Sequence, residues 1–201
     1  MKAILASLLC FVLVASESFA LKGGPPYPVG TGLPGLYAGV LQPAFDPTDP
    51  FSSNSLGLFT LGIPTTGASS GNLIIFSRGR VYSGSIQGIT DTNTATVSAL
   101  LNATFDYTLT SIDPNTGQPV SINVTATITG PFSAKIVRNR NAGVGATALL
   151  RGSATGFLSN GGVDGNGDPI IDGTLTFAVF GFKQSNTAPS GGSLGPPTGG
   201  G

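Results

Sequence analysis

The 201-residue sequence predicts an all-β fold, a single antiparallel up-and-down barrel of about eight strands. No stretch of useful length shows the apolar periodicity of a helix. The apolar segments are short or alternate with polar residues, and clusters of Gly, Pro, Asn and Asp separate them. Eight consecutive antiparallel strands are enough to close a barrel and remove the exposed edges. A two-sheet β-sandwich is the alternative.

Residues 1–20 predict a signal peptide. Lys2 precedes an apolar run from Ala3 to Ala15, and Ser18, Phe19 and Ala20 match the small-x-small site of signal peptidase. The run is shorter than the roughly 18 to 20 residues that a membrane-spanning helix needs. We therefore expect an exported mature chain in the periplasm, at the cell surface or outside the cell.

The mature part of the chain then has an unusual composition. Cys10, Met1 and Glu17 leave with the signal peptide, and the remainder contains no Cys, Met, Glu, His or Trp. A disulfide is therefore excluded, although a chain of about 180 residues can build one core without it. Eight Lys or Arg balance eight Asp in this part, and this balance argues against a nucleic-acid partner.

The same composition argues against an enzyme. Residues 67–71 (GASSG) match the G-x-S-x-G nucleophile pattern, but the chain has no His to accept the serine proton. Asp, Lys and Tyr are the side chains left for acid–base work, and no pair of them stands out by spacing. The sequence therefore predicts a non-enzymatic protein without catalytic residues or an organic cofactor.

Two segments flank the predicted domain. Residues 21–35 are rich in Pro and Gly and predict an extended lead-in, and residues 185–201 have the Gly, Pro and Ser composition of a disordered tail. The barrel domain is expected over residues 36–184. Its expected strands are Leu36 to Gln42, Leu56 to Ile63, Asn72 to Ser77, Arg80 to Ile89, Ala95 to Leu109, Val120 to Ile136, Ala146 to Phe157 and Thr174 to Lys183.

The fifth and sixth expected strands carry the clearest alternation. Odd positions are apolar in the fifth strand, and even positions are apolar in the sixth. If Asp113 to Gln118 (DPNTGQ) forms the turn, the apolar sets share one face, and a one-residue slip would put every side chain on the wrong face. Large residues then face small ones in three pairs: Phe105 with Ala126, Leu101 with Gly130, and Ala99 with Phe132.

Alternation alone does not decide which face is inside the barrel. A small outer-membrane barrel would turn the apolar face toward lipid, but that face would here be rich in Ala and Gly, with no Trp and only four Tyr for aromatic girdles. A barrel with an apolar interior is therefore favoured, and no membrane insertion is expected. A small-ligand or carbohydrate-binding barrel is a further alternative, because small inward residues leave room for a cavity.

The segment GGVDGNGDPIID, residues 161–172, is a candidate Ca²⁺ loop. Its candidate ligands are Asp164, Asn166, Asp168 and Asp172, which take the first, third, fifth and ninth places of a D-x-N-x-D loop. Pro169 stands where an EF-hand needs Gly, and Leu175 where it needs a bidentate Glu. Because Gly, Asn and Asp are also the usual turn residues, a simple hairpin loop is the favoured interpretation.

Topology predicts acidic neighbours for this loop. Connections of an up-and-down barrel alternate between its two ends, so Asp46, Asp49 and Asp113 should share the rim with the loop, together with Arg78 and Arg80. A cation or a partner could bind at such a rim, although charged rims are usually only solvated.

Glycine-punctuated motifs run through the predicted domain. They comprise Gly35-Leu-Tyr37-Ala-Gly39, Leu58-Phe59-Thr60-Leu61, and the hairpin through Gly71, Arg80, Val81, Tyr82, Ser83 and Gly84. Over residues 35–183 the chain resembles a secreted β-barrel domain found in uncharacterised proteins of verrucomicrobial-type bacteria. The resemblance implies an exported barrel and transfers no site residue. We expect a secreted barrel of the bacterial envelope or exterior, with a structural or binding role as an envelope component, a self-associating protein or a small-ligand carrier.

Overall fold

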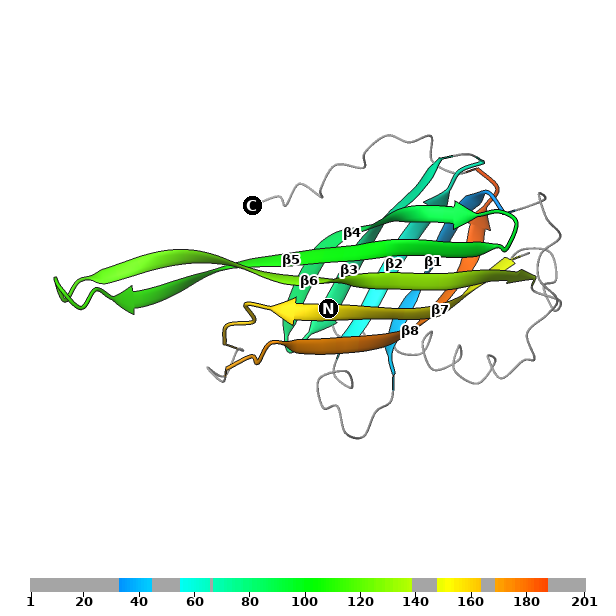
Figure 1. Ribbon diagram of the computed structural model, residues 1–201. Helices are drawn as coiled ribbons and strands as arrows, with labels where there is room; N and C mark the ends of the chain where they lie inside the picture. Colours follow the sequence, from blue (N-terminus) through cyan, green and yellow to red (C-terminus); the bar gives the residue numbers. More distant parts are fainter. Residues whose placement is uncertain (1–32, 45–54, 66, 139–147, 164–168, 188–201) are drawn as a thin grey trace, which may run out of the picture.

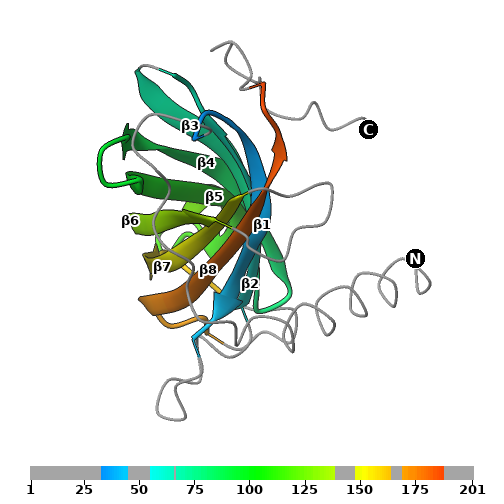
Figure 2. The ribbon, with the colours of Figure 1, turned by 90° about the vertical axis from the view of Figure 1, so that its right-hand side faces the viewer.

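The computed structural model describes residues 33–44, 55–65, 67–138, 148–163 and 169–187. Its eight strands pair in sequence order, each antiparallel to the next, and the first strand pairs with the last to close the barrel (Figures 1 and 2). The predicted up-and-down barrel is confirmed, and the alternative of a two-sheet sandwich is wrong. In the part of the chain that the structure describes, no helix has the length and apolar character needed to cross a membrane.

All eight expected strands are present, with shifts at their ends. Their bounds are β1 Gly35–Pro43, β2 Ser55–Ile63, β3 Ala68–Ser77, β4 Arg80–Asp91, β5 Thr96–Ile112, β6 Pro119–Arg138, β7 Ala148–Ser159 and β8 Gly173–Ser185. The start of β3 differs most, because Ser69 and Ser70 already pair with β4. The G-x-S-x-G segment is thus part of an antiparallel ladder and does not form the strand-to-helix turn that a nucleophile elbow needs.

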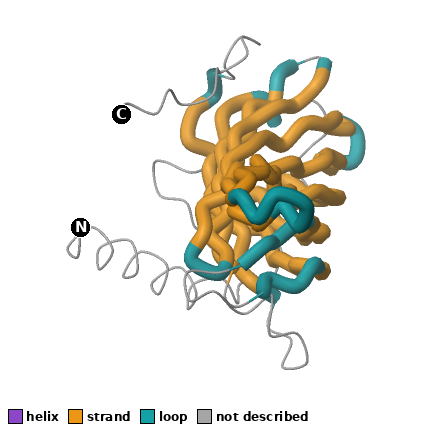
Figure 3. Tube along the Cα trace, turned by 90° about the vertical axis from the view of Figure 1, so that its left-hand side faces the viewer, coloured by secondary structure: helices purple, strands orange, loops and turns teal. Residues whose placement is uncertain are grey.

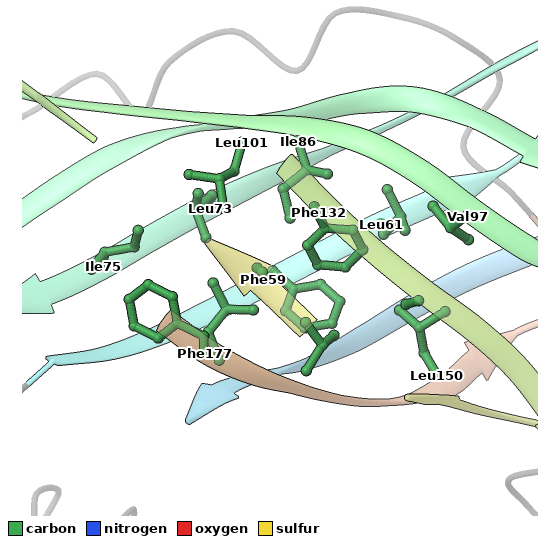
Figure 4. Packing of buried hydrophobic residues seen from close by; sticks show 14 of the residues in the cluster. Phe59, Leu61, Leu73, Ile75, Ile86, Val97, Leu101, Phe132, Leu150 and Phe177 are labelled. Carbon is green, nitrogen blue, oxygen red and sulfur yellow. The ribbon is translucent and has the colours of Figure 1, made fainter. Parts of the chain in front are cut away.

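The apolar face of the sheet points into the barrel. Burial alternates along the strands, and buried aliphatic and aromatic side chains from all eight strands form one cluster. Phe59 of β2 and Phe132 of β6 meet edge to face, with ring centroids 5.6 Å apart (Figure 4). Because β2 and β6 are four strands apart in an eight-stranded barrel, side chains from opposite walls touch and fill the interior at this level.

Inward-facing glycines make room for these aromatic rings. A Cβ atom at Gly39 would lie 2.7 Å from Cζ of Phe59, and one at Gly181 would lie 3.1 Å from the same atom. The first contact is overpacked and the second is tight. The small residues predicted for the inward face therefore accommodate Phe59 at this level of the barrel.

The predicted pairing of β5 with β6 is confirmed residue by residue. Phe105 faces Ala126, Leu101 faces Gly130 and Ala99 faces Phe132. The turn also lies where it was expected, since the Asp113 backbone N–H donates to the Gln118 carbonyl at 2.9 Å.

These two strands extend well beyond the barrel. The pairing of β4 with β5 ends at Thr104, and the pairing of β6 with β7 begins at Thr127. Residues 105–112 and 119–126 pair with each other over eight residue pairs, from Phe105 with Ala126 to Ile112 with Pro119. We call residues 105–126 the arm. In Figure 1 the arm extends from one end of the barrel, roughly along the direction of its strands. Figure 3 shows the molecule from that end.

Candidate functional site at the base of the arm

Arg80 lies where the arm leaves the barrel, and its guanidinium group packs against two aromatic rings. Its Cζ atom is 4.9 Å from the centroid of the Phe105 ring and 4.7 Å from that of the Tyr107 ring. The two rings are nearly parallel, at an interplanar angle of 16°, because residues two apart on β5 point to the same side of the sheet. A cation over an aromatic face is attracted by the ring quadrupole.

The same side chains hold the loop between β7 and β8. Arg80 donates from Nη1 to the Gly161 carbonyl and from Nη2 to the Val163 carbonyl. The Tyr107 hydroxyl donates to the Asn160 carbonyl at 2.9 Å. We call Arg80, Phe105, Tyr107 and residues 160–163 the arm-base cluster. It joins three parts of the chain: the start of β4, the base of the arm and the loop after β7.

Two residues of this loop have backbone conformations that few residue types adopt. Asn160 has a φ of 56° and Gly162 a φ of 70°, in the left-handed region that Asn and Gly adopt most readily. A Cβ at Gly162 would also lie 2.6 to 2.8 Å from atoms of the Tyr107 ring and its hydroxyl. Gly162 is therefore required both by its conformation and by its close approach to the ring.

One of the four predicted cation ligands, Asp172, lies in the described part of the loop. Asp164, Asn166 and Asp168 lie outside the described residues. Asp172 is exposed, and its Oδ1 accepts a hydrogen bond from the Gly161 backbone N–H at 3.1 Å. Within the described ranges, no three His, Cys, Asp or Glu residues gather in a way that could hold a metal ion. Asp172 thus closes the loop by bonding to its backbone.

Two backbone contacts close the loop further along. The Ile170 N–H donates to the Gly162 carbonyl at 2.6 Å, and Val163 forms an isolated antiparallel bridge with Pro169. The described ends of the loop are therefore paired in the manner of a hairpin connection.

The predicted acidic rim needs one correction. Asp113 lies at the tip of the arm, eight residue pairs beyond the last barrel pair, because β5 and β6 are longer than their neighbours. Asp46 and Asp49 lie outside the described residues. Arg80 does lie beside the loop as expected, but it binds backbone carbonyls there. In the described part of this rim, the Arg80 guanidinium group and the rings of Phe105 and Tyr107 make the main contacts.

Asp113 has a local role at the arm tip. Its carboxylate accepts hydrogen bonds from the Asn115 backbone N–H at 2.8 Å and from the Thr116 hydroxyl at 2.9 Å. These bonds favour the ionised form, and they lower the pKa of Asp113 below its ordinary value. An ionised Asp113 therefore stabilises the turn.

Tyr82 and Lys183 are described residues of the barrel interior whose pKa values are shifted. Burial is the main reason why the pKa of Tyr82 is raised, and the nearby Arg80 opposes this shift. Lys183 is buried near the barrel end opposite to the arm, where desolvation lowers its pKa.

Comparisons with protein-family models, with curated proteins and with solved structures found no match. The sequence alone predicted neither the arm nor the arm-base cluster. A signal for the arm was nevertheless present, because the expected strand from Ala95 to Leu109 is longer than its neighbour from Arg80 to Ile89. The excess length of β5 and β6 has to lie outside the barrel.

Proposed function

We propose that this protein is an exported, non-enzymatic β-barrel of the bacterial envelope or exterior that functions by binding a macromolecular partner through its arm. The observation that carries the proposal is the exposure of apolar side chains along one face of the arm. Leu109 is 37% exposed, Val120 43% and Ile122 50%. Exposed apolar surface that is not needed to complete a core is typical of interaction sites.

The two faces of the arm differ in chemistry. One face carries the apolar pairs Tyr107 with Val124 and Leu109 with Ile122. The opposite face is polar from Asp106 to Thr110 and ends in the exposed Ile112 near the tip, and its polar side chains bond across the strands. Thr108 donates to Asn123 at 3.0 Å, and Thr125 donates to Asp106 at 2.6 Å. An isolated two-stranded ribbon is only marginally stable in water, so a partner that covers the apolar face would stabilise the arm.

The filled interior favours an external binding surface over a ligand cavity. Phe59 and Phe132 meet across the barrel, and this contact leaves no space between the two walls at that level. The interior polar groups needed to orient a small ligand are also few, since the buried polar residues among those described are Ser55, Ser69, Ser77 and Lys183.

Polar and charged side chains on the outward face of β5 and β6 favour a barrel in water over one in lipid. Asn102, Ser133 and Lys135 point outward and are exposed. A transmembrane barrel places apolar residues in a continuous outward band, and a Lys in that band is costly. We therefore propose that the barrel does not cross a membrane.

Native mass spectrometry of the protein from its own producing cells tests the proposal. The control is an arm-shortened variant, in which residues 109–122 are replaced by Asn-Gly between Thr108 and Asn123, which face each other. We expect the intact protein to retain a macromolecule, either a further copy or a different partner, and the arm-shortened variant to lose it. Bare monomers in both samples, or one small molecule retained by both, would contradict the proposal.

A further inference from the structure

Closure of the sheet removes strand edges from the barrel wall, but the arm keeps two edges. Residues 105–112 and 119–126 form ladder pairs only with each other, because the ladders with β4 and β7 end at the base of the arm. A strand edge exposes backbone N–H and C=O groups, and these groups can pair with a further extended chain. Each edge of the arm is therefore a candidate for the addition of another strand.

The hydrogen bond at the arm tip determines which backbone groups point away from the ribbon. The Asp113 N–H donates to the Gln118 carbonyl at 2.9 Å, and the register of β5 with β6 is continuous back from this pair. Hydrogen-bonded pairs alternate along an antiparallel ladder, so the odd-numbered residues of β5 bond to β6. The even-numbered residues direct their N–H and C=O groups outward. Near the tip these residues are Thr108, Thr110 and Ile112.

The outward backbone groups of these three residues have no hydrogen-bond partner among the described residues. β4 begins at Arg80, which the register of β4 with β5, if continued, places level with Tyr107. No strand of the described chain therefore lies beside β5 beyond Tyr107. We call residues 108–112 of β5 the open edge.

The opposite edge of the arm, on β6, is interrupted near both of its ends. Pro119 has no N–H, and the Thr125 carbonyl accepts a hydrogen bond from the Asn160 side chain at 3.4 Å. Proline and covering groups protect strand edges from unwanted pairing. The open edge has no Pro, Lys or Arg, and its register with β6 contains no bulge. The arm thus protects one edge and leaves the other available.

The repeat of the open edge selects a polypeptide as its occupant. Outward groups recur at every second residue, a spacing of about 7 Å, which is the repeat of an extended peptide backbone. Lipid acyl chains have no groups that could pair with them. The arm twists as a ribbon in Figure 1, but the edge groups follow the twist, so pairing does not depend on how the arm faces the barrel. A third strand also brings the arm to the number that a sheet needs for independent stability.

Side chains near the open edge restrict which polypeptide fits. Asp106 and Asp113 lie on its two sides, and the arm contains no Lys or Arg. A segment with basic residues at its ends complements this charge, whereas an acidic segment is repelled. Leu109 lies in the middle part of the open edge and is 37% exposed, so an apolar residue opposite it is favoured.

A second copy of the chain fits the open edge less well than such a segment. Two open edges can pair antiparallel, in the register that uses all three outward residues of both copies. This register places Leu109 opposite Ser111, an apolar side chain against a hydroxyl group. It also brings Asp106 of one copy beside Asp113 of the other, where like charges repel.

We propose that the open edge binds an extended segment of a different polypeptide as a third strand, with basic residues at the ends of the segment and an apolar residue opposite Leu109. This inference rests on the proposed function, because it names the chemistry of the partner that the arm binds. Backbone hydrogen bonds hold the segment in place, and the side chains along the edge select its sequence.

Amide hydrogen exchange followed by NMR tests the edge with a synthetic probe, the peptide acetyl-Lys-Thr-Val-Thr-Val-Thr-Lys-amide. In the free protein, we expect the N–H groups of the three outward residues to exchange at least about tenfold faster than those of Leu109 and Ser111, which bond to β6. The probe should slow exchange at the three outward residues by at least about tenfold.

The control probe is the same peptide with methyl groups on the nitrogens of one Val and the adjacent Thr. Neighbouring residues direct their N–H groups to opposite edges of a strand, so this methylation blocks both edges of the peptide. We expect the control probe to leave the exchange rates unchanged. Equal effects of the two probes, or no effect of either, would overturn the proposal.

A matched pair of proline variants tests the edge in the protein. Thr110→Pro removes an outward N–H from the open edge, and Ser121→Pro removes one from the opposite edge; the two residues face each other. Neither change removes a hydrogen bond between β5 and β6. We expect Thr110→Pro to weaken binding of the probe, measured by NMR titration, by more than about tenfold, and Ser121→Pro and Thr110→Ala to weaken it by less than about twofold. Equal weakening by both proline variants would overturn the assignment to β5.

The control probe keeps the test decisive if a variant misfolds. Circular dichroism and heat unfolding compare each variant with the parent protein. If Thr110→Pro disrupts the arm, the comparison of the two probes on the parent protein decides, because that comparison leaves the protein unchanged.

The inference can fail while the proposed function stands. In native mass spectrometry of protein from its producing cells, we expect Thr110→Pro to lose the retained partner and Ser121→Pro to keep it. A partner that is lost by the arm-shortened variant but kept by Thr110→Pro would support binding through the arm and overturn pairing at the open edge. A second copy, a polysaccharide or a lipid bound through the arm would overturn it as well. A partner kept by the arm-shortened variant would contradict the proposed function itself.

Discussion

Gly39 and Gly181 show how single residues shape the interior of the barrel. Both lie against the ring of Phe59: a Cβ at Gly39 would overlap that ring, and a Cβ at Gly181 would make a tight contact with it. Gly normally weakens a strand, because it loses more conformational freedom on folding than other residues. Here the small residues allow a large ring to sit across the barrel axis.

The substitution Gly39→Ala tests this packing. Its Cβ would overlap the Phe180 carbonyl oxygen and would lie 2.6 Å from the Gly181 Cα and 2.7 Å from the Phe59 ring, so the backbone of β8 and the ring both have to move. We expect the free energy of unfolding to fall by about 1 to 3 kcal/mol, measured by urea denaturation. Gly173→Ala is the matched control, because nothing lies within 4 Å of a Cβ at Gly173. Equal effects at both positions would contradict the interpretation.

Asp113 makes the arm tip sensitive to acid. Its folded-state pKa is lowered by hydrogen bonds from Asn115 and Thr116, so the stability it gives is complete above the ordinary value of about 3.9 and is lost as the pH falls through the lower folded value. We expect the Asn115 and Thr116 amide signals in NMR spectra to shift in that acidic range. Asp113→Asn should remove this titration. A midpoint above the ordinary Asp value would contradict the assignment.

Residue identities could be predicted at some of these positions and not at others. The pairs of large with small residues, such as Phe105 with Ala126, follow from alternation and one turn, and the structure has them. The contact of Phe59 with Phe132 depends on how the strands tilt around the barrel, which alternation does not specify. The position of Asp113 was predicted wrongly for a related reason. Strand order shows at which end of the barrel a connection lies, but it does not show how far the hairpin extends beyond that end.

At the scale of elements, the arm results from unequal strand lengths. The Arg78–Gly79 turn starts β4, and the left-handed Asn160 follows the end of β7, so the neighbours of β5 and β6 end where the arm begins. The alternation of β5 and β6 continues without a break past this point. Pattern alone therefore predicted the strands, and only a comparison of their lengths could have predicted the arm.

Arg80 should couple the arm to the loop after β7. The guanidinium contacts both Phe105 and Tyr107 and binds two loop carbonyls, so removing Arg80 or the Tyr107 ring should disrupt one shared cluster. In a double-mutant cycle of Arg80→Met and Tyr107→Leu, we expect a coupling energy of roughly 0.5 to 2 kcal/mol from heat unfolding. Additive effects would show that the two side chains act independently.

The loop of residues 161–172 can be tested directly for cation binding. Asp172 bonds to the Gly161 N–H, which gives it a structural role without a metal ion. Because a ligand that binds only the folded state raises its stability, bound Ca²⁺ would raise the unfolding midpoint above that in EDTA. We expect identical midpoints in differential scanning calorimetry, in agreement with a hairpin loop. A higher midpoint with Ca²⁺ that is lost in Asp164→Asn with Asp168→Asn would instead establish the site.

At the scale of the whole molecule, the barrel and the arm should be energetically separable. Residues 105–112 and 119–126 pair with each other, and the arm-shortened variant keeps Arg80, Phe105 and Tyr107. We expect its unfolding midpoint to lie within about 4 °C of the parent, a change of roughly 1 kcal/mol for a domain of this size. A much larger decrease would show that the distal arm stabilises the barrel, and it would remove the main argument for a binding role.

The pairing of the first strand with the last also determines when the barrel can close during folding. Val40 of β1 pairs with Phe180 of β8, so the sheet keeps two open edges until nearly the whole domain has been synthesised. This one pairing joins residues about 140 positions apart, and because a long loop must be closed before such a contact can form, barrel closure comes late in folding. Under the proposal of export, this delay keeps the polypeptide threadable during translocation, and the order of the strands itself would postpone folding until the chain has reached the far side of the membrane.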